Sequence, residues 1–273
     1  MSDDGTSAPN TTPVKPALTV PLKPTGRYTG RFALLYVGLG VVMVGAVAAI
    51  IVAFAGSGIG SGHASGSWST WKPSSGTTAK VTTEIATHVA QEYHLNAKGA
   101  PFVAVVSGPP QLANGTHKVE ISHVALKKTA TTDSGIQIFP AGSTWTDQLC
   151  GLGTGCSIAT GQPTEQRGRL VRREALEVAL YTFKFAPAIQ SVVAFMPPPP
   201  GQTASTLLYL QKDNLKQQLS QPLSKTLPLT KPPLPSEDDP TEAPMIDKLT
   251  PVFNYSVQQL QDNSALLIIA PAE

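Results

Sequence analysis

The chain has 273 residues, of which 41 % are hydrophobic and 14 % are charged, and its formal net charge is +2. This balance excludes a strongly basic nucleic-acid-binding protein and a highly charged disordered chain, so we expect no nucleic-acid partner. A polytopic transporter is also excluded, because only one stretch is apolar enough to cross a bilayer.

Residues 1–31 have the composition of a disordered tail. Prolines recur between Pro9 and Pro24 among Ser, Thr and Asp, and no apolar periodicity runs through them. Such a segment cannot bury a core, so we expect a disordered, Pro-rich stretch before the first structured element.

Residues 32–54 form an apolar stretch of 23 residues that contains no charge. As a helix it would be ~35 Å long, which is enough for a hydrocarbon core of ~30 Å. We therefore predict one transmembrane helix lying in the lipid bilayer. A cleaved signal peptide is the alternative, because Ala53-Phe54-Ala55 matches the small-residue cleavage pattern. Signal peptides have shorter apolar regions, which favours the uncleaved anchor.

The charges that flank this stretch predict its orientation. The basic residues before it are Lys15, Lys23, Arg27 and Arg31, and the next one after it is Lys72. By the positive-inside rule the N-terminus is cytoplasmic and the C-terminal body is extracytoplasmic.

Small residues recur at every fourth position of the predicted membrane helix, at Gly45, Ala49 and Ala53. This spacing lets two helices approach closely, so a homodimer or a partner subunit in the membrane is one interpretation. The alternative is that Gly and Ala are simply common in membrane helices.

The remaining chain is predicted to form a flexible Gly/Ser tether, residues 55–71, and one extracytoplasmic α+β domain, residues 72–273. Two long helices are expected at 79–93 and 165–185, and each is followed by two strands. The expected strands are 101–107, 117–126, 188–196, 204–211, 252–258 and 265–270. The last two form a C-terminal hairpin, and the sheet is mainly antiparallel. A short helix capped by Asp213 and an extended Pro-rich arm, residues 222–251, lie between strands.

Cys150 and Cys156 are separated by five residues, of which three are Gly, so the chain can turn back and join the two sulfurs. We predict a disulfide, which suits an exported domain. Two buried thiols are the alternative. A zinc site lacks the further ligands that it needs.

Four arginines crowd the start of the second long helix: Arg167, Arg169, Arg172 and Arg173. A helical wheel places Arg172 on the apolar side and Arg173 on a polar side, so Arg172, with Arg169 and Arg173, is a candidate ligand or partner contact. A structural ion pair is the alternative. Positive charge here opposes the helix dipole and needs compensation. Residues 237–242, which are acidic, or an external phosphate-bearing polymer or anionic lipid could supply it.

No assembled catalytic motif occurs in the sequence. G-x-S-x-G, H-E-x-x-H and the phosphate-binding loop are absent, and we expect no cofactor and no metal. His88 and Glu92 are four residues apart on one helix, and His123 is expected on the inward face of its strand.

These features favour a non-enzymatic binding or scaffolding module of the cell envelope, with a protein partner there. The alternative is a membrane-anchored hydrolase acting on cell-wall polymer or peptide. A cleft that holds His88, Glu92 or His123 beside Ser or a carboxylate would favour the hydrolase. A sensor is a third interpretation, although the tail is short for an output domain.

Overall fold

The computed structural model describes residues 68–114, 117–130, 135–237 and 241–272. The expected tail, the membrane helix with Gly45, Ala49 and Ala53, and most of the tether lie outside the described residues. Within the described ranges no helix is long and apolar enough to cross a membrane.

Four α-helices occur in the described part of the chain: α2 (Thr78–Glu92), α3 (Glu165–Phe185), α4 (Lys216–Ser220) and α5 (Ala243–Leu249). The two long helices begin at threonine caps, where the side chains of Thr77 and Thr164 accept backbone N–H groups of the first turn. Both long helices were predicted, and the bounds of α3 are those expected from the sequence.

Nine strands of the described residues form one mixed sheet, which confirms an α+β fold. The strands are β1 (Ala104–Gly108), β2 (Gln111–Asn114), β3 (His117–Leu126), β4 (Gln137–Pro140), β5 (Thr144–Cys150), β6 (Ser191–Phe195), β7 (Thr206–Gln211), β8 (Val252–Gln259) and β9 (Ala265–Pro271). Their order is β1-β5-β6-β7-β8-β9-β3-β2, and β4 also pairs with β3. Only the β5–β6 and β3–β9 pairs are parallel in this sheet.

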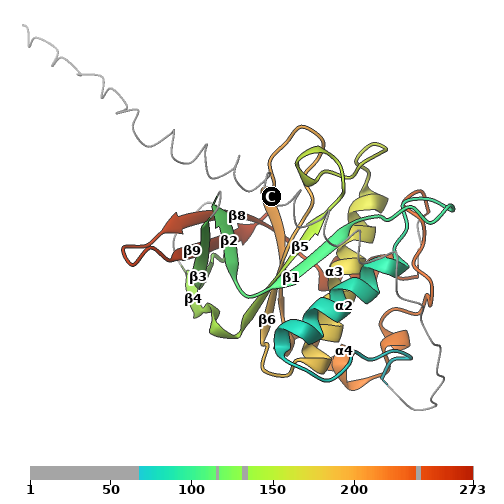
Figure 1. Ribbon diagram of the computed structural model, residues 1–273, viewed down its shortest axis with the longest axis horizontal. Coiled ribbons are helices and arrows are strands. Elements are labelled where there is room, and N and C mark those ends of the chain that lie inside the picture. The colour runs from blue at the N-terminus through green and yellow to red at the C-terminus, as the bar shows by residue number, and fades with distance from the viewer. Residues whose placement is uncertain (1–67, 115–116, 131–134, 238–240, 273) are drawn as a thin grey trace, which may run out of the picture.

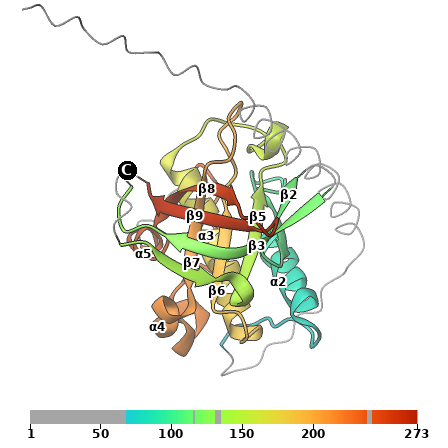
Figure 2. The same ribbon diagram turned by 90° about the vertical axis from the view of Figure 1, so that its left-hand side faces the viewer.

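The sheet curls until it nearly closes on itself. Strands β1 and β2 follow one another across Pro109 and Pro110, yet β1 pairs with β5 at one end of the order and β2 pairs with β3 at the other. Helices α2 and α3 lie against one side of this sheet (Figure 1), and β3, β8 and β9 curve over the opposite side (Figure 2).

Two hydrophobic cores result from this curvature. The larger lies between the helices and the sheet and contains Ile85, Leu176 and Leu208. The smaller fills the concave side of the sheet and contains Phe195 and Leu267. Strand β6 contributes to both cores, because successive residues of a strand point to opposite faces of the sheet.

The predicted pairing is confirmed for β6 with β7 and for β8 with β9, but the first helix–strand–strand unit is wrong. Strand β1 pairs with β5, and β3 pairs with β2, β4 and β9. Strands β2, β4 and β5 were not expected. The sequence of β5, TWTDQLC, looks polar, yet five of its residues are buried on the two faces of the strand: Thr144, Thr146, Asp147, Leu149 and Cys150.

The Pro-rich segment, residues 222–251, is not an extended arm. Leu223 and Leu227 belong to the larger core, and Ile246 of α5 is buried. The segment also makes a short helix, α5, which packs on α3. Asp213 does not cap a helix through its side chain and instead pairs with Lys216 at 3.1 Å.

Candidate functional site

Cys150 and Cys156 form the predicted disulfide, which closes a tight loop after β5. Gly151 is required there, because a Cβ at this position would lie 2.4 Å from the Ile158 Cα. Gly155 has φ +63°, a conformation that favours glycine. The disulfide therefore fixes the loop that leads into α3.

Arg169 and Arg172, predicted as ligand contacts, bind within the molecule. Arg169 reaches Glu165 at 2.6 Å and Asp247 at 3.1 Å, and Arg172 also pairs with Asp247. Burial tends to raise the pKa of Asp247, but hydrogen bonds from the two arginines lower it below its ordinary value. These pairs join α5 to α3. An external contact of Arg169 or Arg172 stays a prediction.

Arg173, which the helical wheel places on the polar side of α3, is the most deeply buried arginine of the described chain. Its side chain is 2 % exposed, against 15 % for Arg172. Its Nε lies 2.6 Å from Glu242 Oε2, and its Nη2 donates to the Leu229 carbonyl at 3.0 Å. The Pro-rich segment covers the polar side of α3 and supplies Glu242, so one residue of the acidic run pairs with an arginine of this helix.

Three glutamates, Glu174, Glu177 and Glu242, surround the single cation Arg173 in a buried cluster. Glu177 Oε2 accepts from the Tyr93 hydroxyl at 2.7 Å and lies 3.3 Å from Arg173 Nη1. Glu174 is fully buried, and neither of its carboxylate oxygens has a hydrogen-bond partner in the described structure. Burial, together with the charge of Glu177, raises the pKa of Glu174 well above its ordinary value. Glu174 therefore keeps its proton to a higher pH than an exposed glutamate does.

A cleft of about 310 Å³ opens beside Glu177, between α2, α3 and the Pro-rich segment. Its lining includes Trp68, His88, Glu92, Glu177 and Tyr181. Burial raises the pKa of Glu177, and the nearby Glu92 carboxylate raises it further. Two carboxyl groups with different environments thus meet at one cleft, one exposed and one partly buried.

Aromatic rings form one wall of the cleft. Trp68 meets Tyr181 edge-on with centroids 5.2 Å apart, and Trp71 stacks on His88 at 3.9 Å. Both tryptophans pack against the larger core, so the end of the expected tether belongs to the folded domain. Burial lowers the pKa of His88 to about 4, which leaves its ring neutral at physiological pH.

The prediction that His123 lies on the inward face of its strand is wrong. The side chain is exposed, because the pairing of β3 with β9 shifts between Ile121 and His123 and breaks the alternation of the strand. Its Nδ1 lies 3.0 Å from the Ser122 hydroxyl. His123 does not line the cleft, whereas His88 and Glu92 do.

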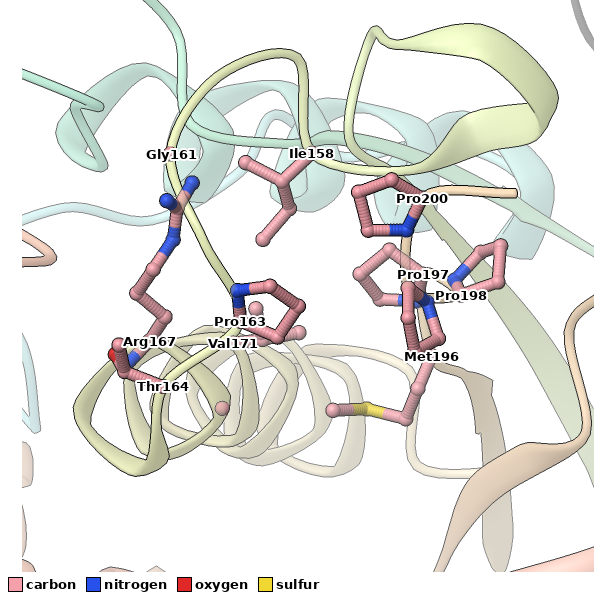
Figure 3. A pocket seen from close by; sticks show the side chains of 12 residues that line it. Ile158, Gly161, Pro163, Thr164, Arg167, Val171, Met196, Pro197, Pro198 and Pro200 are labelled. Carbon is pink, nitrogen blue, oxygen red and sulfur yellow. The ribbon is translucent and has the colours of Figure 1, made fainter. Parts of the chain in front are cut away.

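A second hollow of about 120 Å³ lies at the other end of α3 and is mostly apolar. Met196 and Pro197 to Pro200 form one wall, and Ile158 and Pro163 lie across the hollow from them (Figure 3). The Arg167 side chain stands at its margin and extends toward Gly161.

In the described ranges no group of three or more His, Cys, Asp or Glu residues is placed to hold a metal ion. No protein-family model, curated protein or solved structure matches the chain. The site must therefore be interpreted from its own chemistry.

Sequence reasoning found His88 and Glu92 but missed Glu177, Glu174 and Tyr181 as parts of the site. The spacing of Arg173 and Glu177, four residues apart on one helix, was the available signal for the buried cluster. Nothing local in the sequence indicates that residues 222–230 close over α3 to form the cleft.

Proposed function

We propose that the chain is a single-pass membrane protein of the cell envelope, anchored by residues 32–54 with its N-terminus in the cytoplasm. Its α+β domain acts outside the cytoplasm as a binding or scaffolding module. The excess of basic residues before the apolar stretch supports this orientation. The Cys150–Cys156 disulfide supports an oxidising compartment for the domain.

The cleft between α2 and α3 carries the binding part of this proposal. It is preformed, and buried hydrogen bonds hold one of its walls, since Tyr93 and Arg173 fix Glu177. The Glu92 side chain has no ion pair or hydrogen bond within the described ranges, so it is available to a partner. Pockets that combine an apolar wall with a few convergent polar groups are typical ligand sites.

The arrangement of groups in the cleft favours binding over nucleophilic catalysis. In the described structure no hydrogen bond joins His88 to a serine hydroxyl, and the His88 ring is stacked on Trp71. A nucleophile next to an oriented base is the signature of covalent catalysis. We accordingly propose a non-enzymatic module with a protein partner in the envelope, and we retain a homodimer through Gly45, Ala49 and Ala53 as a second mode of association.

Site-specific photocrosslinking of the full chain in its native membrane tests this proposal. A photoreactive amino acid at Ser224, in the cleft, should give a discrete adduct, and the same group at Gln217 on α4 should not. The substitution Glu92→Lys should lower the Ser224 adduct about tenfold, which corresponds to a loss of ~1.4 kcal/mol in binding. Equal adducts from both positions, or an adduct that Glu92→Lys leaves unchanged, would contradict binding at the cleft.

The two carboxyl groups of the cleft support a hydrolase as the second candidate. A protonated Glu177 could act as general acid and Glu92 as general base toward a cell-wall polymer or peptide. The test is turnover of cell-wall fragments by the full chain. Activity that falls about 10²-fold in both Glu177→Gln and Glu92→Gln would favour this candidate and contradict the non-enzymatic one.

A further inference from the structure

Arg167 differs from the other arginines of the second long helix. Arg169, Arg172 and Arg173 each pair with a carboxylate, whereas Arg167 makes no ion pair within the described part of the chain. Arg167 is only 8 % exposed. Its Nη1 donates to the Gln162 carbonyl at 3.3 Å, its Nη2 donates to the Thr160 carbonyl, and its Nε has no hydrogen-bond partner among the described residues. A buried positive charge is thus held by neutral groups alone.

The electrostatic surroundings of Arg167 are also positive. It lies in the first turn of α3, where the N–H groups of a helix of 21 residues carry the positive end of the dipole. Glu165, the acid nearest to Arg167 in the chain, pairs with Arg169 at 2.6 Å, and Glu237, next to the lining residue Ser236, accepts from the Leu234 N–H at 2.9 Å. Helix and guanidinium therefore attract the same kind of ligand, an anion.

A cavity of about 510 Å³ adjoins this position. Its polar lining side chains come from Asn96, Thr160, Gln162, Thr164, Gln166, Arg167 and Ser236, and none of the described lining residues is a carboxylate. Asn96 Oδ1 already accepts from the Lys98 and Ala100 N–H groups, which leaves the amide N–H₂ of Asn96 as an unused donor. The side chains of Gln166 and Ser236 have no hydrogen-bond partner in the described ranges. The cavity thus offers several donors together with one cation.

The backbone at residues 160–162 is shaped to hold the guanidinium. Gly161 has φ +83°, and a Cβ at this position would lie 1.9 Å from Arg167 Nη1. Only glycine lets the loop pass so close to Arg167. The guanidinium is therefore positioned before any ligand arrives, which reduces the entropy lost on binding.

We propose that this cavity, formed by Arg167, the first turn of α3, Asn96 and Ser236, binds a phosphate group. Phosphate is preferred to carboxylate because its three terminal oxygens can accept from more of the donors present. In the proposed envelope location, a lipid headgroup or a phosphate-bearing polymer would present this group. The site is separate from the cleft, so its failure would leave the proposed binding at the cleft intact.

The test is equilibrium dialysis of the full chain in neutral detergent against labelled inorganic phosphate at constant ionic strength. Gln166→Glu adds a negative charge at an exposed position of the cavity without disturbing Arg167, and it should weaken phosphate binding at least about tenfold. The matched control, Gln217→Glu on α4, should bind as the wild type does. Arg167→Gln should abolish binding, and Arg167→Lys should retain a part of it.

Three outcomes would overturn the site: no saturable phosphate binding by the wild-type chain, an equal effect of Gln166→Glu and Gln217→Glu, or tighter binding of acetate than of phosphate. If phosphate binds as proposed, vesicles of phosphatidylglycerol and soluble glycerol phosphate then distinguish the two sources. Gln166-dependent binding to the vesicles indicates a lipid headgroup, and binding to the soluble ester alone indicates a polymer.

Discussion

Ser107 and Asp147 are register partners across β1 and β5, and the Ser107 hydroxyl donates to Asp147 Oδ1 at 2.6 Å. The same Ser107 oxygen accepts from Trp145 Nε1 at 2.8 Å. Asp147 is fully buried, and its Oδ2 has no hydrogen-bond partner in the described structure. Burial raises the pKa of Asp147 to about 7, although the Ser107 hydrogen bond works against this shift.

Asp147 should make the folded domain less stable as pH rises. Its pKa in the folded state is above the ordinary value of 3.8, so the folded state binds the proton more tightly than the unfolded state. The stability that it contributes is present below pH 3.8 and is lost as pH rises to about 7. By linkage, the free energy lost over this window is at most about 4 kcal/mol.

The substitution Asp147→Asn tests this relationship. It keeps an acceptor for Ser107 and removes the ionisation, so the free energy of unfolding should fall less between pH 5 and pH 8 than in the wild type. Urea titration followed by tryptophan fluorescence measures this difference. Asp213→Asn, on an exposed residue, is the control and should keep the wild-type pH dependence. An unchanged pH dependence in Asp147→Asn would show that Asp147 is already ionised at pH 5.

The pairing of Arg173 with Glu242 should be critical for holding the Pro-rich segment on α3. Glu242→Ala leaves a buried guanidinium without its closest carboxylate and removes the acceptor of the Leu229 N–H. We expect a loss of about 3–5 kcal/mol in the free energy of unfolding. Breaking the more exposed pair by Asp247→Asn should cost about 1 kcal/mol. Equal losses in the free energy of unfolding for the two substitutions would contradict the claim that burial determines how much each ion pair contributes to stability.

Substitution of Glu174, unlike that of Glu242, should raise the free energy of unfolding of the domain. Both of its carboxylate oxygens are buried and have no hydrogen-bond partner in the part of the chain that the structure describes. Glu174→Met has a similar volume and leaves no polar atom unsatisfied, so the free energy of unfolding at pH 8 should rise by about 1 kcal/mol. Glu120→Met, on an exposed position of β3, should change it by about 0.5 kcal/mol or less. A strong destabilisation by Glu174→Met would reveal a polar interaction of Glu174 that matters to the fold.

The disulfide closes a small loop and should stabilise the domain modestly. Replacing Cys150 and Cys156 together by Ala should lower the free energy of unfolding by about 2 kcal/mol, since the entropy removed from the unfolded chain depends on loop length. Non-reducing peptide mapping of the chain isolated from its native membrane checks the bond itself. Recovery of both residues as free thiols would contradict the disulfide and weaken its support for an exported domain.

The elements that the sequence predicts well are those whose pattern is local. The apolar side chains of α3 recur at helical spacing and Thr164 supplies a cap, so its bounds follow directly. The two short hairpins likewise join neighbouring segments of the chain. Strand β5 was missed because its neighbours come from distant segments, and these bury residues as polar as Asp147.

The candidate site, too, could be predicted only where its pattern is local in the sequence. A helical wheel treats α3 as a helix with one apolar side, but the Pro-rich segment covers the other side and buries Arg173 more deeply than Arg172. The β6–β7 hairpin separates that segment from α3 in the sequence. The spacing of residues within α3 therefore cannot indicate that the segment packs on this helix. The bulge that turns His123 outward also could not be predicted from the sequence of β3, because it depends on the register between β3 and β9.

Membrane topology is the most direct test of the central claim, that the α+β domain lies outside the cytoplasm on a single anchor. A cysteine placed at Gln217, on the exposed surface of α4, and another at Ser7 in the tail are labelled separately in intact cells with a membrane-impermeant maleimide. We predict labelling of Gln217→Cys in intact cells and labelling of Ser7→Cys only after the membrane is permeabilised. Labelling of Ser7→Cys alone in intact cells, or of neither before permeabilisation, would contradict this orientation.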